Sequence, residues 1–133
     1  MALEDQGRPG DAIKAYQQSI VASHGEYAVA HYGLGVLLAG EGEYKGAADS
    51  FRQAIARPGE HVPASHNNLG VMLARMGRLA EAGSEFEIAL RQTAGLFDDA
   101  AYNLKLWRSL LNTSKKTQVA SLRVSRPIGV SLK

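Results

Sequence analysis

The sequence predicts an all-α fold, an α-solenoid built from stacked helix–turn–helix units. Three observations predict it: one stretch occurs twice, its offset recurs over most of the chain, and apolar residues within each copy follow helical spacing. The stretch HYGLGVLLAGEGEY, residues 31–44, returns as HNNLGVMLARMGRL, residues 66–79, at an offset of 35. A fixed period of this size is characteristic of supersecondary units that stack on one another.

The same offset aligns residues of one kind throughout the first 112 positions. Each aligned set keeps its chemistry, which indicates that each unit places that residue in the same surroundings. The clearest sets are glycine or asparagine (Gly7, Gly42, Gly77, Asn112), alanine (Ala12, Ala47, Ala82), aromatic (Tyr16, Phe51, Phe86) and leucine (Leu34, Leu69, Leu104).

The chain begins partway through a unit, because Leu3 holds the place of Leu38. The first expected helix therefore lies within residues 8–23 and is the second helix of a partial repeat. Without a complete neighbour its apolar side would be exposed, so either the chain is a fragment of a longer repeat protein or a partner or a second copy covers this helix.

Each complete unit then supplies two helices. Leu34, Leu37 and Leu38, and their counterparts 35 residues later, recur at three and four places, as one face of a helix does. Gly42 and Gly77 are expected to end these first helices in the left-handed conformation. The second helices carry the alanine and aromatic positions as one buried stripe.

Glycine also occurs inside the first helices, at Gly35 and Gly70. A helical glycine costs about 1 kcal/mol relative to alanine, so close packing of the paired helix is the expected compensation, with Ala47 and Ala82 as the expected contacts. The fourth unit has Lys105 at this place, which indicates that no second helix covers it. The sequence thus predicts two full repeats, an N-terminal partial repeat and a C-terminal capping helix.

Composition divides the chain into a repeat domain, residues 1–112, and a tail, residues 113–133. The domain has ten Lys and Arg against thirteen acids, and the tail has five basic residues and no acid. The tail is basic and Ser-rich and is expected to be flexible. Its apolar residues Leu122 and Val124, and later Ile128, Val130 and Leu132, nevertheless alternate as in short strands.

The repeats resemble the tetratricopeptide repeat family, most closely in YGLGVLLAGEGEYKGAADSFRQAI and NNLGVMLARMGRLAEAGSEFEIAL and more weakly in GRPGDAIKAYQQSI and AAYNLKLW. The resemblance covers about residues 1–112. It departs from the family in its period, since the family's usual repeat has 34 residues, and in having His31 and His66 where a bulky aromatic residue is common.

The resemblance implies a concave groove, lined by the first helices, that grips an extended peptide or an amphipathic helix of another protein. Asn68 and Asn103 are the most suggestive positions, because a carboxamide can both donate to a peptide carbonyl and accept from its N–H. The family's acidic-tail clamp is not expected, since its cationic positions are absent. The implied groove residues are Tyr32, Val36, Asn67, Asn68, Val71, Arg75, Asp99, Tyr102, Asn103 and Leu106.

No catalytic constellation appears, so we predict neither an enzyme nor a cofactor. The chain has no cysteine, which excludes thiolate catalysis and zinc sites built on cysteine. His31 and His66 lie on successive units, and with no carboxylate position beside them they are interpreted as structural rather than metal-binding. Trp107 shares its place with Leu37 and Met72 and is expected to pack in the core or at the end of the array.

The sequence as a whole favours a cytoplasmic adaptor or scaffold that binds another protein, with possible self-association through the incomplete first repeat. No stretch is long and apolar enough to span a membrane. One alternative is the recognition domain of a larger enzyme, such as a glycosyltransferase. Another is nucleic-acid binding through the basic tail, which the lack of aromatic residues among its charges weakens.

Overall fold

The computed structural model describes residues 9–22, 28–112, 119 and 121–125. These residues form six helices, and the described part contains no strand, as the repeat pattern predicts. The helices are α2 (Pro9–Ala22), α3 (Ala28–Gly40), α4 (Tyr44–Ile55), α5 (His61–Arg75), α6 (Leu79–Gln92) and α7 (Asp98–Asn112).

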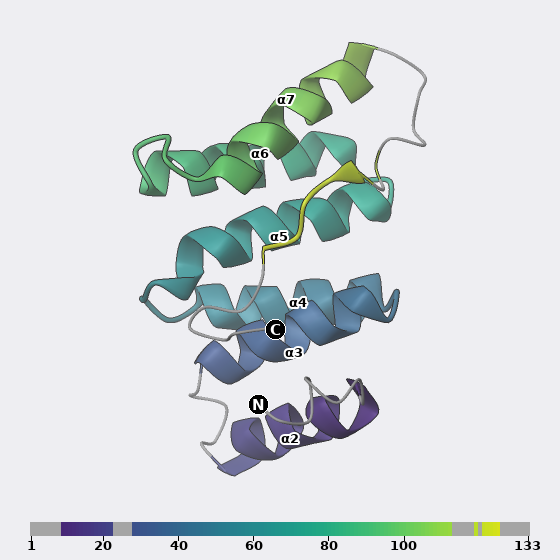
Figure 1. Cartoon of the computed structure of the whole chain (residues 1–133), viewed down its shortest axis with the longest axis vertical. Coiled ribbons are helices and arrows are strands. Elements are labelled where there is room, and N and C mark those ends of the chain that lie inside the picture. Colours follow the sequence, from purple (N-terminus) through teal and green to yellow (C-terminus); the bar gives the residue numbers. More distant parts are fainter. Residues whose placement is uncertain (1–8, 23–27, 113–118, 120, 126–133) are drawn as a thin grey trace.

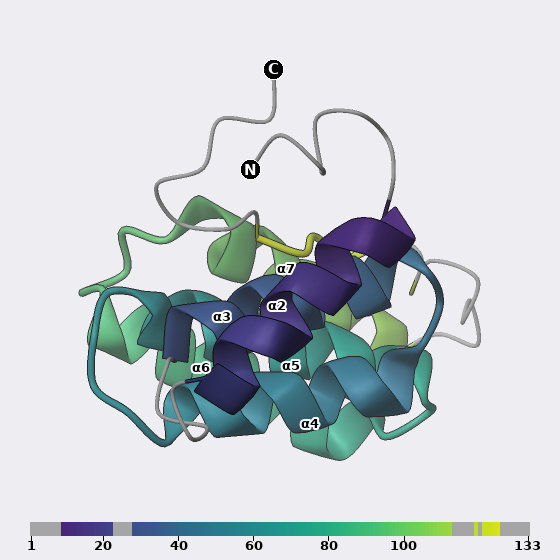
Figure 2. The ribbon, with the colours of Figure 1, turned by 90° about the horizontal axis from the view of Figure 1, so that it is seen from below.

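The helices stack as the two-layer array expected of a solenoid (Figure 1). Each helix packs against the next along the chain, and α5 also contacts α3 and α7, its counterparts in the neighbouring units. The first helices α3, α5 and α7 thus form one layer, and α4 and α6 pack on its other side (Figure 2). We call the side of α3, α5 and α7 that faces away from α4 and α6 the inner face.

The two predicted glycine turns are present at the ends of α3 and α5. Gly42 has φ 79° and Gly77 has φ 84°, values that a residue with a Cβ rarely adopts. In each turn the following N–H folds back onto the helix: Glu43 donates to the Leu38 carbonyl at 2.9 Å, and Arg78 donates to the Leu73 carbonyl at 2.8 Å. A glycine turn therefore ends the first helix at the same position of each complete repeat.

Glycine inside the first helices allows close packing, and the nearest atoms belong to an aromatic ring that the prediction did not name. A Cβ on Gly35 would lie 2.6 Å from the Phe51 ring, and one on Gly70 would lie 2.6 Å from the Phe86 ring. The Ala82 carbonyl also lies close, 3.1 Å from the position of a Cβ on Gly70, in line with the predicted contact of Ala82. The aromatic ring of each second helix fills the space that the glycine leaves.

The end of the array is closed by Trp107 on α7. Its indole lies against Gly83, where a Cβ would collide with the ring, and its Nε1–H donates to the Leu79 carbonyl at 2.6 Å. The side chain is part-buried against the core, in agreement with the end-cap interpretation. Lys105 is exposed, as expected where no further helix follows among the described residues.

The described tail residues lie on the inner face rather than away from the domain. Residues 121–125 cross α5 as an extended segment (Figure 1), on the side of the molecule opposite α4 (Figure 2). Leu122 is buried within the core cluster, and Val119 and Val124 pack against it. The flexibility expected of the tail stays a prediction, and positions 113–118, 120 and 126–133 lie outside the described part.

Candidate functional site

The inner face holds a row of three buried asparagines, which we call the asparagine ladder: Asn67 and Asn68 on α5 and Asn103 on α7. Each is 0% exposed. Burying three carboxamides is costly unless their donors and acceptors are satisfied. The hydrogen-bond partners of these carboxamides therefore indicate what the site can bind.

Asn103 forms a closed pair of hydrogen bonds with the backbone of Arg123. Its Nδ2 donates to the Arg123 carbonyl at 2.8 Å, and its Oδ1 accepts from the Arg123 N–H at 2.6 Å. The Asn103 side chain thus forms hydrogen bonds with both the N–H and the carbonyl of one extended residue, as the backbone of a neighbouring strand would.

Asn68, which lies one repeat before Asn103, forms the same pair of hydrogen bonds with Ser125, which lies two residues after Arg123. Its Nδ2 donates to the Ser125 carbonyl at 3.0 Å, and its Oδ1 accepts from the Ser125 N–H at 2.6 Å. Two residues of extended chain advance about 6.6–6.8 Å, and packed helix axes lie about 8–10 Å apart. Equivalent positions on successive units can therefore reach alternate residues of one segment.

Asn67 links the other two carboxamides and fixes their orientation. Its Oδ1 accepts from Asn103 at 2.8 Å, and its Nδ2 donates to Asn68 Oδ1 at 3.1 Å and to the Arg123 carbonyl at 2.9 Å. Because every oxygen faces a donor and every nitrogen faces an acceptor, the network admits one arrangement of the three amides. The ladder is therefore pre-organised to receive a backbone.

Tyr32 completes the row at its α3 end. It is 0% exposed, and its hydroxyl donates to the Ser125 carbonyl at 3.1 Å while it accepts from Asn68 at 3.4 Å. Burial raises the pKa of the Tyr32 phenol well above its usual range, although the hydrogen bond from Asn68 acts in the opposite direction. The hydroxyl therefore keeps its proton and remains a donor to the segment.

Two side chains of the segment make specific contacts of their own. The Arg123 guanidinium lies 3.6 Å from the centroid of the Tyr102 ring, a cation–π contact. The Ser125 hydroxyl donates to Asp99 Oδ2 at 3.1 Å and accepts from Asn67 Nδ2 at 3.3 Å. The groove thus contacts side chains as well as backbone.

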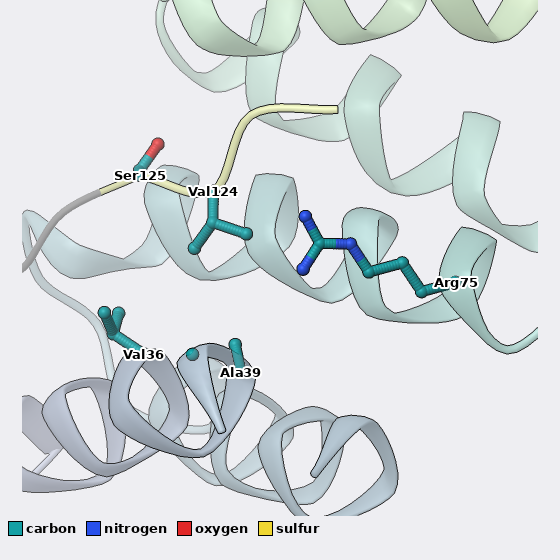
Figure 3. A pocket seen from close by; sticks show the side chains of 6 residues that line it. Val36, Ala39, Arg75, Val124 and Ser125 are labelled. Carbon is teal, nitrogen blue, oxygen red and sulfur yellow. The ribbon is translucent and has the colours of Figure 1, made fainter. Parts of the chain in front are cut away.

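The implied groove residues fall into three groups in the structure. Tyr32, Asn67, Asn68, Asp99, Tyr102 and Asn103 contact the segment, as described above. Val36 and Arg75 line a hollow beside it, together with Ala39 and Val124 (Figure 3). Val71 is fully buried and Leu106 is part-buried against the core, so these two belong mainly to the packing of the array.

Sequence reasoning missed the segment that occupies the groove. Leu122, Arg123, Val124 and Ser125 were assigned to a flexible tail, and the alternation of Leu122 and Val124 was the available signal of extended chain. That alternation is visible in the structure, where Leu122 is buried in the core cluster and Val124 faces the hollow beside Val36 and Ala39.

The histidines are held by local contacts. His66 Nδ1 lies 2.7 Å from Glu85 Oε1, and His61 Nε2 lies 2.6 Å from the Ala54 carbonyl, while His31 is buried on α3. In the described part of the chain no three His, Asp or Glu side chains gather as a metal site would need. No described helix is long and apolar enough to cross a membrane.

Among the described residues, α2 and the neighbouring helices present apolar surface. Val21 is 75% exposed, and it borders shallow hollows that Ile20 and Leu34 also line. Self-association through this end stays a prediction.

Comparison with known families agrees with the repeat architecture. A family model for the tetratricopeptide repeat matches residues 1–61 and 42–97. No curated protein and no solved structure matches the chain significantly. The family's repeats generally mediate interactions between proteins. Because the model covers most of the chain and the helices stack in the corresponding order, this chain belongs to the tetratricopeptide repeat family.

Proposed function

We propose that this protein is an interaction module whose inner groove binds an extended segment of a partner protein by its backbone. The observation that carries the proposal is the pair of closed contacts described above: Asn103 with both backbone groups of Arg123, and Asn68 with both backbone groups of Ser125. The position of the chain's own residues 121–125 in the groove supports this proposal.

The geometry favours an extended peptide over an amphipathic helix. In a helix most backbone N–H and carbonyl groups already bond to one another, so a helical ligand could not satisfy the buried carboxamides of the ladder. An extended peptide offers both groups of every second residue to the same side. Rigid helices present the ladder, so that the peptide bears most of the cost of ordering.

The N–H groups of the ligand provide the test. A chain carrying Arg123→Pro and Ser125→Pro loses the two N–H donors that the ladder accepts, and its own segment is expected to leave the groove. A labelled synthetic peptide with the sequence of residues 119–128, VASLRVSRPI, is then expected to bind in its place. Fluorescence anisotropy measures the dissociation constant.

Methylation of single backbone nitrogens in this peptide distinguishes ladder binding from general adhesion. N-methylation at Arg123 or Ser125 is expected to weaken binding at least tenfold, because each removes a buried hydrogen bond and adds a methyl group against a carboxamide. N-methylation at Val124 is the matched control and is expected to change binding by less than about threefold, since its N–H meets none of the described ladder residues. Equal losses at all three positions would contradict the proposal.

A further inference from the structure

The groove contacts the four residues 122–125 unequally. Leu122 is buried to 3% exposure and Ser125 to 6%, so these positions are enclosed. Arg123 is exposed, but its guanidinium lies 3.6 Å from the centroid of the Tyr102 ring. Val124 is part-buried and borders a hollow that its side chain does not fill.

The hollow beside Val124 has a volume of about 280 Å³ and is lined by Val36, Ala39, Gly40 and Arg75 in addition to the segment itself. Figure 3 shows the Val124 side chain pointing into it, toward Val36 and Ala39, while the Ser125 side chain points away. A cavity of about 150 Å³ is enough to hold a benzene ring. The space under Val124 is therefore large enough for an aromatic side chain.

The walls of the hollow suit an aromatic ring in chemistry as well as in size. Val36 and Ala39 provide apolar surface from α3, and Arg75 extends into the hollow from α5 (Figure 3). The Arg75 guanidinium is held 5.5 Å from the centroid of the Tyr44 ring. A guanidinium that is already packed on one ring is positioned to stack on a second ring, which adds to the burial of apolar surface.

The Ser125 position, in contrast, admits only a small hydroxyl-bearing residue. The hydroxyl contacts the Asp99 carboxylate at 3.1 Å and the Asn67 amide at 3.3 Å. A larger side chain would displace the ladder, and a phosphate would bring negative charge against Asp99. The groove thus encloses the side chain at position 125 and leaves unfilled space beside the side chain at position 124.

We infer that the partner is a protein segment with the pattern apolar–Arg–aromatic–Ser, and that it displaces the chain's own Leu122–Arg123–Val124–Ser125. This inference rests on the proposed function. The partner runs in the same direction as the chain's own segment, from Asn103 on α7 to Asn68 on α5. Because position 124 is a valine, the internal segment is a weaker ligand of the same kind. It occupies the groove until the partner binds.

Two peptides test this inference on the chain that carries Arg123→Pro and Ser125→Pro. One is the 119–128 peptide and the other is the same peptide with Val124→Phe. The Val124→Phe peptide is expected to bind at least tenfold more tightly, since a buried aromatic ring removes several further apolar carbons from water. Equal or weaker binding by the Val124→Phe peptide overturns the inference while leaving the proposed function in place; binding by neither peptide overturns both.

A variant of the hollow shows whether the gain arises there. A Cβ on Gly40 meets open space, so Gly40→Leu is expected to fold and to place its side chain in the hollow. In that background the affinity ratio of the two peptides should fall toward one, and a ratio that stays at ten or more counts against the inference. Ala39→Leu fills the same space from the next position if Gly40→Leu proves unstable by circular dichroism.

Displacement is measured on the otherwise unchanged full chain. Because the sequence contains no cysteine, the exposed Ser121 can be replaced, Ser121→Cys, and labelled with one fluorophore. The Val124→Phe peptide is expected to release the labelled segment and lower its anisotropy at concentrations about tenfold below those that the 119–128 peptide requires. Because the internal segment is tethered, release is expected at peptide concentrations above those that saturate the proline-substituted chain; release by both peptides at equal concentrations would contradict the inference.

Discussion

Removal of two carboxamides, Asn68→Ala with Asn103→Ala, is expected to weaken binding of the 119–128 peptide by about 1,000-fold in the chain that carries Arg123→Pro and Ser125→Pro. Each asparagine forms two hydrogen bonds with the ligand backbone. A net value of about 1 kcal/mol for each bond gives about 4 kcal/mol in total, which corresponds to about three powers of ten in the dissociation constant.

The matched control for this prediction removes a carboxamide elsewhere. Gln92 is exposed at the end of α6, and Gln92→Ala should leave the dissociation constant within about twofold. If the double asparagine variant binds the peptide within threefold of its parent, the ladder does not hold the ligand.

Loss of the aromatic ring that packs the two helices of one repeat together should destabilise the array. Phe86→Ala is expected to lower the free energy of unfolding by about 3–5 kcal/mol, because the ring is 0% exposed and fills the space beside Gly70. Neighbouring units depend on one another for their cores, so the loss is expected to spread beyond α6. Urea unfolding followed by circular dichroism measures the change.

An exposed apolar residue provides the comparison for Phe86. Leu96 is 83% exposed in the turn before α7, and Leu96→Ala should alter the free energy of unfolding by no more than about 0.5 kcal/mol. A loss below about 1 kcal/mol for Phe86→Ala would show that the aromatic positions do not hold the two helices of a repeat together.

The repeat itself was the part of the fold that the sequence predicted well. The turns at Gly42 and Gly77, the aromatic position of Phe51 and Phe86 and the end of the array at Lys105 all follow from local requirements that recur once per unit. The sequence did not show which residue faces Gly35, because helical periodicity gives the buried side of a helix but not the partner across the interface.

The site was only partly predictable for a similar reason. Asn68 and Asn103 were singled out because their chemistry suits a peptide backbone, and family resemblance placed them on the groove. The segment at 121–125 could not be placed there from sequence alone, since its contacts join residues up to 93 positions apart, as between Tyr32 and Ser125. Composition described the tail as basic and Ser-rich, whereas its position depends on a few buried hydrogen bonds.

Hydrogen exchange of three neighbouring backbone amides in the unmodified chain tests the ladder most directly. Resolved by nuclear magnetic resonance, the amides of Arg123 and Ser125 should exchange slowly, since they donate to Asn103 and Asn68, while the amide of Val124 between them exchanges faster by at least tenfold. Alternating protection of this kind can arise only if successive repeats hold every second residue of the segment. Three equal rates, or fastest exchange at Arg123 and Ser125, would contradict backbone binding by the asparagine ladder.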